Sequence, residues 1–156
     1  MAKPSDAAAL AGFQVLLARE SEGLELDPRA VLRGVRAVFK DPARGTYYVA
    51  EERGRLGARL VGCLLVTTEW SDWRNGMWWW VQSVYVVPPA RRRGVFRALY
   101  GHVKRLAERR RGVRGLRLYV YRRNARARKV YEALGMSGGY YRTYEWAVPR
   151  PRRRSA

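Results

Sequence analysis

The sequence predicts one α/β (α+β) domain, in which a mixed sheet carries helices on both faces. Two strand-like segments in the first half flank Gly54 and Gly57, which indicates an antiparallel hairpin. Strand-like and helix-like segments alternate in the second half, which indicates parallel or mixed pairing. The chain has 156 residues, so we expect a single domain over residues 1–148 and a basic, flexible tail over residues 149–156.

Two helices are expected first. Residues 6–20 carry apolar side chains at helical spacing, and Ser5 is a candidate N-cap. Residues 28–40 predict a helix more clearly, because they carry one apolar stripe. Asp27 can cap this helix, and Pro28 suits its first position.

The strands and the remaining helices follow in order. We expect strands at residues 46–51, 59–69, 77–87, 116–121 and 140–148. We expect helices over residues 95–111 and over a last segment that Asn124 caps and Gly135 ends. Within the third strand, Trp78 and Trp80 face opposite to Trp79, so at least one face of the sheet carries aromatic rings that are exposed or face a ligand.

The charge balance is extreme, with 32 Lys and Arg against 13 Asp and Glu and a net charge of +19. Such a field attracts nucleic acid, anionic lipid or phosphorylated cofactors. A solvated basic surface explains the same composition. No apolar run reaches the length of about 18 residues that spans a bilayer, and the start lacks a signal-peptide pattern. Because Cys63 is the single cysteine, we expect no internal disulfide and no cysteine-ligated metal site. Together these features predict a cytoplasmic location.

The segment between the third strand and the following helix is the sharpest local signal. A helix N-terminus presents unpaired amides and a partial positive charge, so it attracts anions. Gly94 permits close backbone approach or a positive φ, and Arg91–Arg93 add charge beside it. This pattern indicates a diphosphate site, although an ordinary turn with surface arginines has the same local features.

Two motifs carry a family resemblance. Residues 86–99, VVPPARRRGVFRAL, resemble the coenzyme A motif of the GNAT acyl-CoA N-acetyltransferase superfamily, Gln/Arg-x-x-Gly-x-Gly/Ala, with Arg91 first and Gly94 fourth. Residues 124–136, NARARKVYEALGM, resemble the family segment Asn-x-x-Ala-x-x-x-Tyr-x-x-x-Gly-Phe/Met. The chain departs from the pattern at Phe96, where the family has Gly or Ala, and it leaves almost no room for the family's first strand.

The resemblance implies a mostly antiparallel sheet with a splayed central strand pair and a first strand that is short or missing. It implies acetyl-CoA as acyl donor and no metal. The implied cofactor-binding residues are Val84, Tyr85, Val86, Arg91, Arg92, Arg93, Gly94, Val95, Phe96, Arg97, Asn124 and Tyr131. By the same resemblance Tyr131 protonates the leaving thiolate, although its place on an apolar helix face also suits a core tyrosine.

The acceptor side is implied less directly. Gln82 stands where spermidine/spermine-type relatives have a catalytic glutamate, and an amide can orient a substrate but cannot act as a base. Glu69 and Asp72 are the nearest carboxylates, and either one also suits a solvated turn. Glu20 and Glu22 end the first helix, where polyamine acetyltransferases bind their acceptor, although Glu20 also suits pairing with surface arginines.

Three functions remain open from the sequence. The first is direct acetyl transfer to the primary amine of a small molecule in a ternary complex, and the second is transfer to a protein or peptide amine. The third is a non-enzymatic nucleic-acid-binding module on the same scaffold. The expected partners are acetyl-CoA and an amine acceptor. A nucleic acid or acidic partner at the basic surface and a homodimer stay open, and no membrane partner is expected.

Overall fold

Four strands form one sheet in the order β1-β2-β3-β4. The β1–β2 and β2–β3 pairs are antiparallel and the β3–β4 pair is parallel, which confirms the mixed, mostly antiparallel sheet. The strands are β1 (Thr46–Gly54), β2 (Gly57–Ser71), β3 (Gly76–Val86) and β4 (Val113–Arg117). The expected hairpin is confirmed, because Gly54 pairs with Gly57 at its end.

The computed structural model describes residues 1–55, 57–139 and 141–148. The chain divides into two compact units, Met1–Tyr121 and Arg122–Ala156. The first unit holds the sheet and three long helices, and the second holds the helix α4 (Ala125–Ala133). The basic tail expected at residues 149–156 lies outside the described residues.

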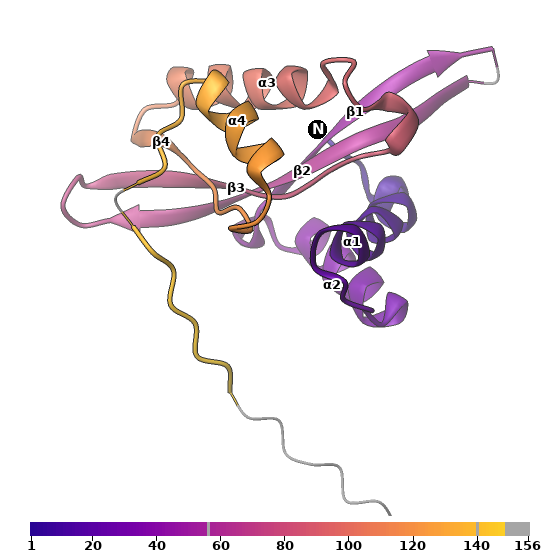
Figure 1. Ribbon diagram of the computed structural model, residues 1–156, viewed down its shortest axis with the longest axis horizontal. Helices are drawn as coiled ribbons and strands as arrows, with labels where there is room; N and C mark the ends of the chain where they lie inside the picture. Colours follow the sequence, from indigo (N-terminus) through magenta and orange to yellow (C-terminus); the bar gives the residue numbers. More distant parts are fainter. Residues whose placement is uncertain (56, 140, 149–156) are drawn as a thin grey trace, which may run out of the picture. The chain divides into compact units, whose positions relative to one another are not determined.

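Helices cover both faces of the sheet, as Figure 1 shows. The helices of the first unit are α1 (Ala7–Glu22), α2 (Pro28–Lys40) and α3 (Val95–Arg109), with short 3-10 turns at Pro4–Asp6, Pro42–Arg44 and Pro88–Ala90. One core lies under α1 and α2 and contains Cys63, and the other lies under α3 and contains Leu64. These two neighbours are both fully buried because successive side chains of a strand point to opposite faces.

The expected start of α2 is confirmed, and that of α1 is not. The Asp27 carboxylate accepts a hydrogen bond from the Arg29 amide at 2.9 Å and so caps α2. Ser5 lies inside the 3-10 turn that precedes α1, so the predicted Ser5 cap is wrong. Proline at position 4 starts this tighter turn, and the Asp6 carboxylate holds the Lys3 amide at 2.7 Å.

Three further expectations concern strands. The backbone amide of Ala2 donates a hydrogen bond to the Tyr47 carbonyl at 2.9 Å, but no strand precedes α1 in the described residues. This agrees with the short or missing first strand that the resemblance implies. The strand expected at residues 116–121 begins and ends earlier, because only Val113–Arg117 pairs with β3. The closing strand expected at residues 140–148 is wrong for residues 141–148, which form no strand. Alternating side chains make strand pairing feasible, but a strand also needs a neighbouring backbone to bond.

Gly45, between α2 and β1, offers a test of the packing. Its φ is +133°, and an added Cβ would lie 2.5 Å from the Val66 carbonyl oxygen. We expect Gly45→Ala to lower the free energy of unfolding by about 2 kcal/mol or more, since neither the backbone at position 45 nor that of Val66 in β2 can move easily. Urea denaturation measures this change. Gly34→Ala in α2 is the control, because no atom lies within 4 Å of its added Cβ, and it should gain about 0.5–1 kcal/mol. Equal effects of the two changes would contradict the packing.

Candidate active site

β3 and β4 separate part-way along β3. Their pairing covers Met77 to Trp80 on β3, whereas β3 itself continues to Val86. Ser83 has a φ of +51°, and the pairing of β2 with β3 shifts register at this place. An extra residue bends a strand and increases its twist. Beyond Trp80, β3 therefore has an edge that no strand pairs within the described residues, which is the splayed pair that the resemblance implies.

The backbone amides along this open edge alternate between pointing toward β2 and pointing away from it. The Val87 amide donates to the Val61 carbonyl of β2 at 3.0 Å. Because amides alternate in direction along a strand, those of Val84 and Val86 point away from β2 and that of Tyr85 points toward it. The Val86 carbonyl accepts a hydrogen bond from Arg91 Nε at 2.7 Å on the same open side.

The open edge leads directly into the predicted phosphate loop. After the turn Pro88–Ala90, residues 91–94 form a second turn, and α3 begins at Val95. Gly94 has a φ of +80°, and an added Cβ would meet no atom within 4 Å, so this position faces open space. The first hydrogen bond into α3 runs from the Ala98 amide to the Gly94 carbonyl at 2.9 Å. The amides of Val95 and Arg97 therefore precede the helical ladder and suit an anion.

Two of the three loop arginines bind carboxylates from other elements. Arg91 pairs with Glu20 at the end of α1 at 2.5 Å, and Arg93 pairs with Glu52 of β1 at 2.6 Å. Arg92 is exposed, has a φ of +66°, and forms no ion pair within the described ranges. The loop is thus anchored on two sides while Arg92 keeps its charge toward solvent.

Glu20 joins α1 to both β3 and the loop. Its second carboxylate oxygen accepts a hydrogen bond from the Tyr85 hydroxyl at 2.8 Å, and the Arg91 guanidinium lies over the Tyr85 ring at 5.4 Å. The hydrogen bond from Arg91 lowers the pKa of Glu20, and burial together with the bond to Glu20 raises the pKa of Tyr85 to about 12. Glu22, the other predicted acceptor residue of α1, is exposed at the end of the helix.

The lowered pKa of Glu20 predicts a pH-dependent contribution to stability. A carboxylate with a depressed folded-state pKa stabilises the fold above its unfolded pKa of about 4.3 and loses this effect as the pH falls through the folded value. We expect Glu20→Gln to be less stable than the wild type at pH 7, and we expect this difference to be smaller at pH 3, because the wild-type carboxylate loses its contribution as the pH falls through its lowered pKa. Urea denaturation at both pH values measures the difference, with Glu22→Gln as the matched control. A difference that is the same at both pH values would contradict the ion pair.

The sheet face that packs against α1 and α2 continues past these helices as a polar and aromatic surface, which we call the floor. We define this floor by Thr67 and Glu69 of β2, Trp78, Trp80 and Gln82 of β3, Arg117 of β4 and the following Tyr119. Glu69 accepts hydrogen bonds from Trp80 Nε1 and from Arg117 Nη1, each at 2.6 Å. The Arg117 guanidinium lies over the Trp78 ring at 4.2 Å. These contacts hold the Glu69 carboxylate in one orientation.

Gln82 lies at the other end of the floor. Its Nε2 donates to Thr67 Oγ1 at 2.7 Å, and its Oε1 lies 3.5 Å from the Tyr119 hydroxyl. Glu69 pairs with Trp78 across the strands, so it lies four residues along β3 from Gln82, or about 13 Å. Asp72 is exposed in the β2–β3 turn, where its carboxylate accepts from the Trp73 amide at 2.8 Å. The structure therefore brings Glu69 and Gln82 to one face and leaves Asp72 outside the floor.

Five floor residues were not among the predicted site residues, namely Thr67, Trp78, Trp80, Arg117 and Tyr119. The alternation of residues 116–121 already places Arg117 and Tyr119 on one face. What the pattern lacks is the pairing register that sets Arg117 beside Trp80.

The second unit holds the remaining predicted residues. Asn124 Oδ1 accepts from the Ala127 amide at 3.0 Å, which confirms the predicted cap of α4, and Gly135 has a φ of +82° just beyond the helix. Burial raises the pKa of Tyr131, so its phenol is protonated at neutral pH. A protonated phenol is the form that a general acid requires.

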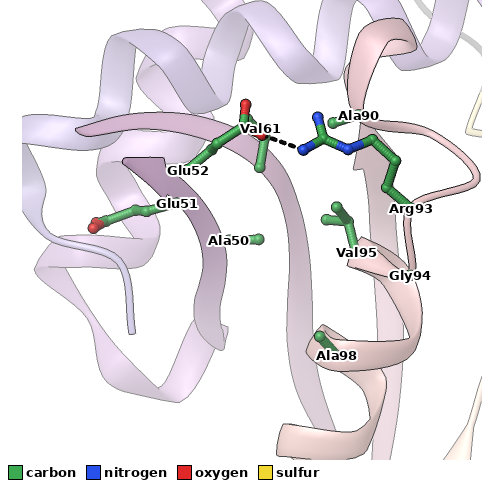
Figure 2. A pocket seen from close by; sticks show the side chains of 9 residues that line it. All are labelled: Ala50, Glu51, Glu52, Val61, Ala90, Arg93, Gly94, Val95 and Ala98. Carbon is green, nitrogen blue, oxygen red and sulfur yellow. Dashed lines mark hydrogen bonds and ion pairs between the residues drawn. The ribbon is translucent and has the colours of Figure 1, made fainter. Parts of the chain in front are cut away.

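A hollow of about 270 Å³ lies on the α3 side of the loop (Figure 2). Its walls are Ala50, Glu51, Glu52, Val61, Ala90, Arg93, Gly94, Val95 and Ala98. The pair of Arg93 with Glu52 spans it, as the dashed line in Figure 2 shows. None of the floor residues lines this hollow, so it is separate from the face that carries Glu69 and Gln82.

The comparisons with known proteins agree with this geometry. The family model described as "Acetyltransferase (GNAT) family" matches residues 13–136. The chain belongs to the GNAT acetyltransferase family. A GNAT domain of this kind supports acetyl transfer in general, and the family typically uses acetyl-CoA.

Solved structures show the same fold over nearly the whole chain. A "possible acetyltransferase" from Clostridium difficile 630 is 37% identical, with 96% of this chain and 95% of that chain covered and a TM-score of 0.84. The ribosomal-protein-alanine N-acetyltransferase from Brucella melitensis biovar Abortus 2308 is 20% identical, with 95% and 96% covered and a TM-score of 0.72. The second likeness shows the fold alone. No curated protein matches the chain.

No described helix combines the length and hydropathy that a membrane crossing requires. No three His, Cys, Asp or Glu side chains of the described ranges gather where they could hold a metal ion.

Proposed function

We propose that this GNAT family member transfers the acetyl group of acetyl-CoA to the primary amine of a small molecule. The observation that carries the proposal is the edge of β3 that no described strand pairs, which follows the bulge at Ser83 and runs directly into the Gly94 loop. An extended thioester arm suits such an edge, because backbone amides and carbonyls there lack strand partners. The amine attacks directly in a ternary complex, and the cytoplasm is the proposed location.

The residues present fit the coenzyme. The amides of Val95 and Arg97 and the exposed guanidinium of Arg92 would hold the diphosphate. Phe96 departs from the family pattern, but its ring lies 5.9 Å from the Tyr100 ring of α3, so we infer that its bulk does not block the loop. When bound, the coenzyme supplies an activated thioester, and the amide of Val84 or Val86 would polarise the carbonyl as an oxyanion-type donor.

The floor is the proposed acceptor site. Glu69 would receive the proton of the acceptor ammonium through a chain of waters, since it lies four residues along β3 from Gln82. Trp80 and Arg117 would keep its carboxylate oriented. Gln82 would orient the amine, since an amide can donate and accept hydrogen bonds but cannot take the proton. Tyr131 of the second unit remains the proposed general acid for the leaving thiolate, on the resemblance of residues 124–136.

The test is the release of free coenzyme A thiol from acetyl-CoA across a panel of small amines, peptides and a protein lysate. We expect turnover with at least one small primary amine. Turnover with peptide or protein amines alone would support the second function considered from the sequence. Absence of turnover with every acceptor, in a preparation that binds acetyl-CoA, would refute the proposed function.

A further inference from the structure

The outer face of α2 carries an aligned row of cations, which we call the α2 stripe. It consists of Arg29, Arg33, Arg36 and Lys40, all of them exposed. The spacings of four, three and four residues keep these side chains within roughly 60° of arc on a helix with 3.6 residues per turn. The stripe extends along about 16 Å of the helix axis, at a rise of 1.5 Å per residue.

The stripe keeps its charge. Helix α2 contains no acidic residue, and no ion pair involves any of the four cations within the described part of the chain. The carboxylates at the two ends of the helix are used locally. Asp27 caps α2, and Asp41 binds the Ala43 amide and the Arg44 side chain. Four neighbouring positive charges therefore remain open to a ligand.

We propose that the α2 stripe docks the phosphodiester backbone of a nucleic acid. A single strand carries one phosphate per nucleotide on a flexible backbone that can follow a row of cations, so cations spaced by about 4.5–6 Å along the helix can each meet a phosphate. Three of the four cations are arginines, whose planar guanidinium binds phosphate oxygens in a bidentate manner. The net charge of +19 adds attraction at long range.

The apolar side of α2 argues against a membrane as the occupant. A helix that lies in a bilayer interface exposes its apolar face. In α2 that face, with Val31, Leu32 and Val35, packs into the core under the sheet. Leu24 and Leu26 in the preceding loop are half exposed, at 50% and 37%, so anionic vesicles form the competing arm of the test.

The experiment measures the affinity of the full chain for a fluorescein-labelled 20-nucleotide single-stranded RNA at several salt concentrations. The variant is Arg33→Gln with Arg36→Gln, since Gln preserves helix propensity. Each phosphate contact contributes about −0.7 to the slope of log K against log salt for single strands, so the double variant should flatten the slope by about 1.4. Acetyl-CoA turnover, measured in parallel, should stay at the wild-type value.

The control is Lys104→Gln with Arg105→Gln on α3, which removes the same charge from the other side of the sheet. We expect this control to change the RNA slope by less than about 0.5, since it removes no phosphate contact. Equal flattening in both variants would overturn the proposal, because binding would then follow net charge alone. Loss of binding to phosphatidylserine vesicles in the α2 variant, with RNA binding unchanged, would also overturn it.

Discussion

Gly94→Asp will abolish coenzyme binding while the protein stays folded. The added side chain meets no protein atom within 4 Å, so it enters the open space in front of the loop. Its carboxylate would oppose the diphosphate with about 3 kcal/mol for two unit charges 5 Å apart at an effective dielectric of about 20. We expect the Kd for acetyl-CoA, measured by isothermal titration calorimetry, to rise at least about 100-fold.

Gly94→Asn is the matched control for this change. Asn has nearly the shape of Asp, carries no charge, and tolerates the left-handed backbone that Gly94 adopts at φ +80°. We expect Asn to weaken binding much less than Asp. Equal Kd values for the two variants would show that the diphosphate lies elsewhere, and circular dichroism of both variants checks the fold.

Tyr131→Phe will lower turnover and leave the affinity for acetyl-CoA almost unchanged. Burial raises the pKa of this phenol, so the wild-type group holds its proton at neutral pH and can donate it to the leaving thiolate. General acid catalysis contributes about 100-fold or more, so we expect kcat to fall by about this factor. Steady-state kinetics measure kcat, and calorimetry measures the affinity.

Tyr141→Phe removes the same hydroxyl from an exposed tyrosine, with 85% of its surface accessible, and should keep wild-type kinetics. Wild-type turnover in Tyr131→Phe would refute the acid role. A loss of acetyl-CoA affinity equal to the loss of turnover would assign Tyr131 to binding instead. A fall in kcat alone would support the proposed chemistry.

Much of the fold was predictable because its signals are local. The cap at Asp27, the cap at Asn124 and the hairpin between Gly54 and Gly57 each depend on neighbours only a few residues away. The alternation of Trp78, Trp79 and Trp80 is also local, and the structure buries Trp79 against α3 as the opposite-face pattern requires. The Ser5 cap failed because a competing local signal, the turn that Pro4 begins, takes the same residues.

The candidate site was predictable in part. The Gly94 loop is contiguous in the sequence, so its residue types and spacing already indicated an anion site. The partners of its arginines were not predictable, because Glu20 is 71 residues and Glu52 is 41 residues away from them. The Glu69–Arg117 pair spans 48 residues and depends on the register of three strands.

The sequence by itself determined the elements whose information lies within one or two turns of chain, namely the caps at Asp27 and Asn124, the hairpin, and the glycine before α3. Only the tertiary structure decided where β3 leaves β4 and which carboxylates the arginines meet. It also decided that residues 141–148 form no strand. The physical reason is that strand pairing and ion pairs depend on distances between residues far apart in the chain. A local pattern can permit such contacts but cannot choose among them.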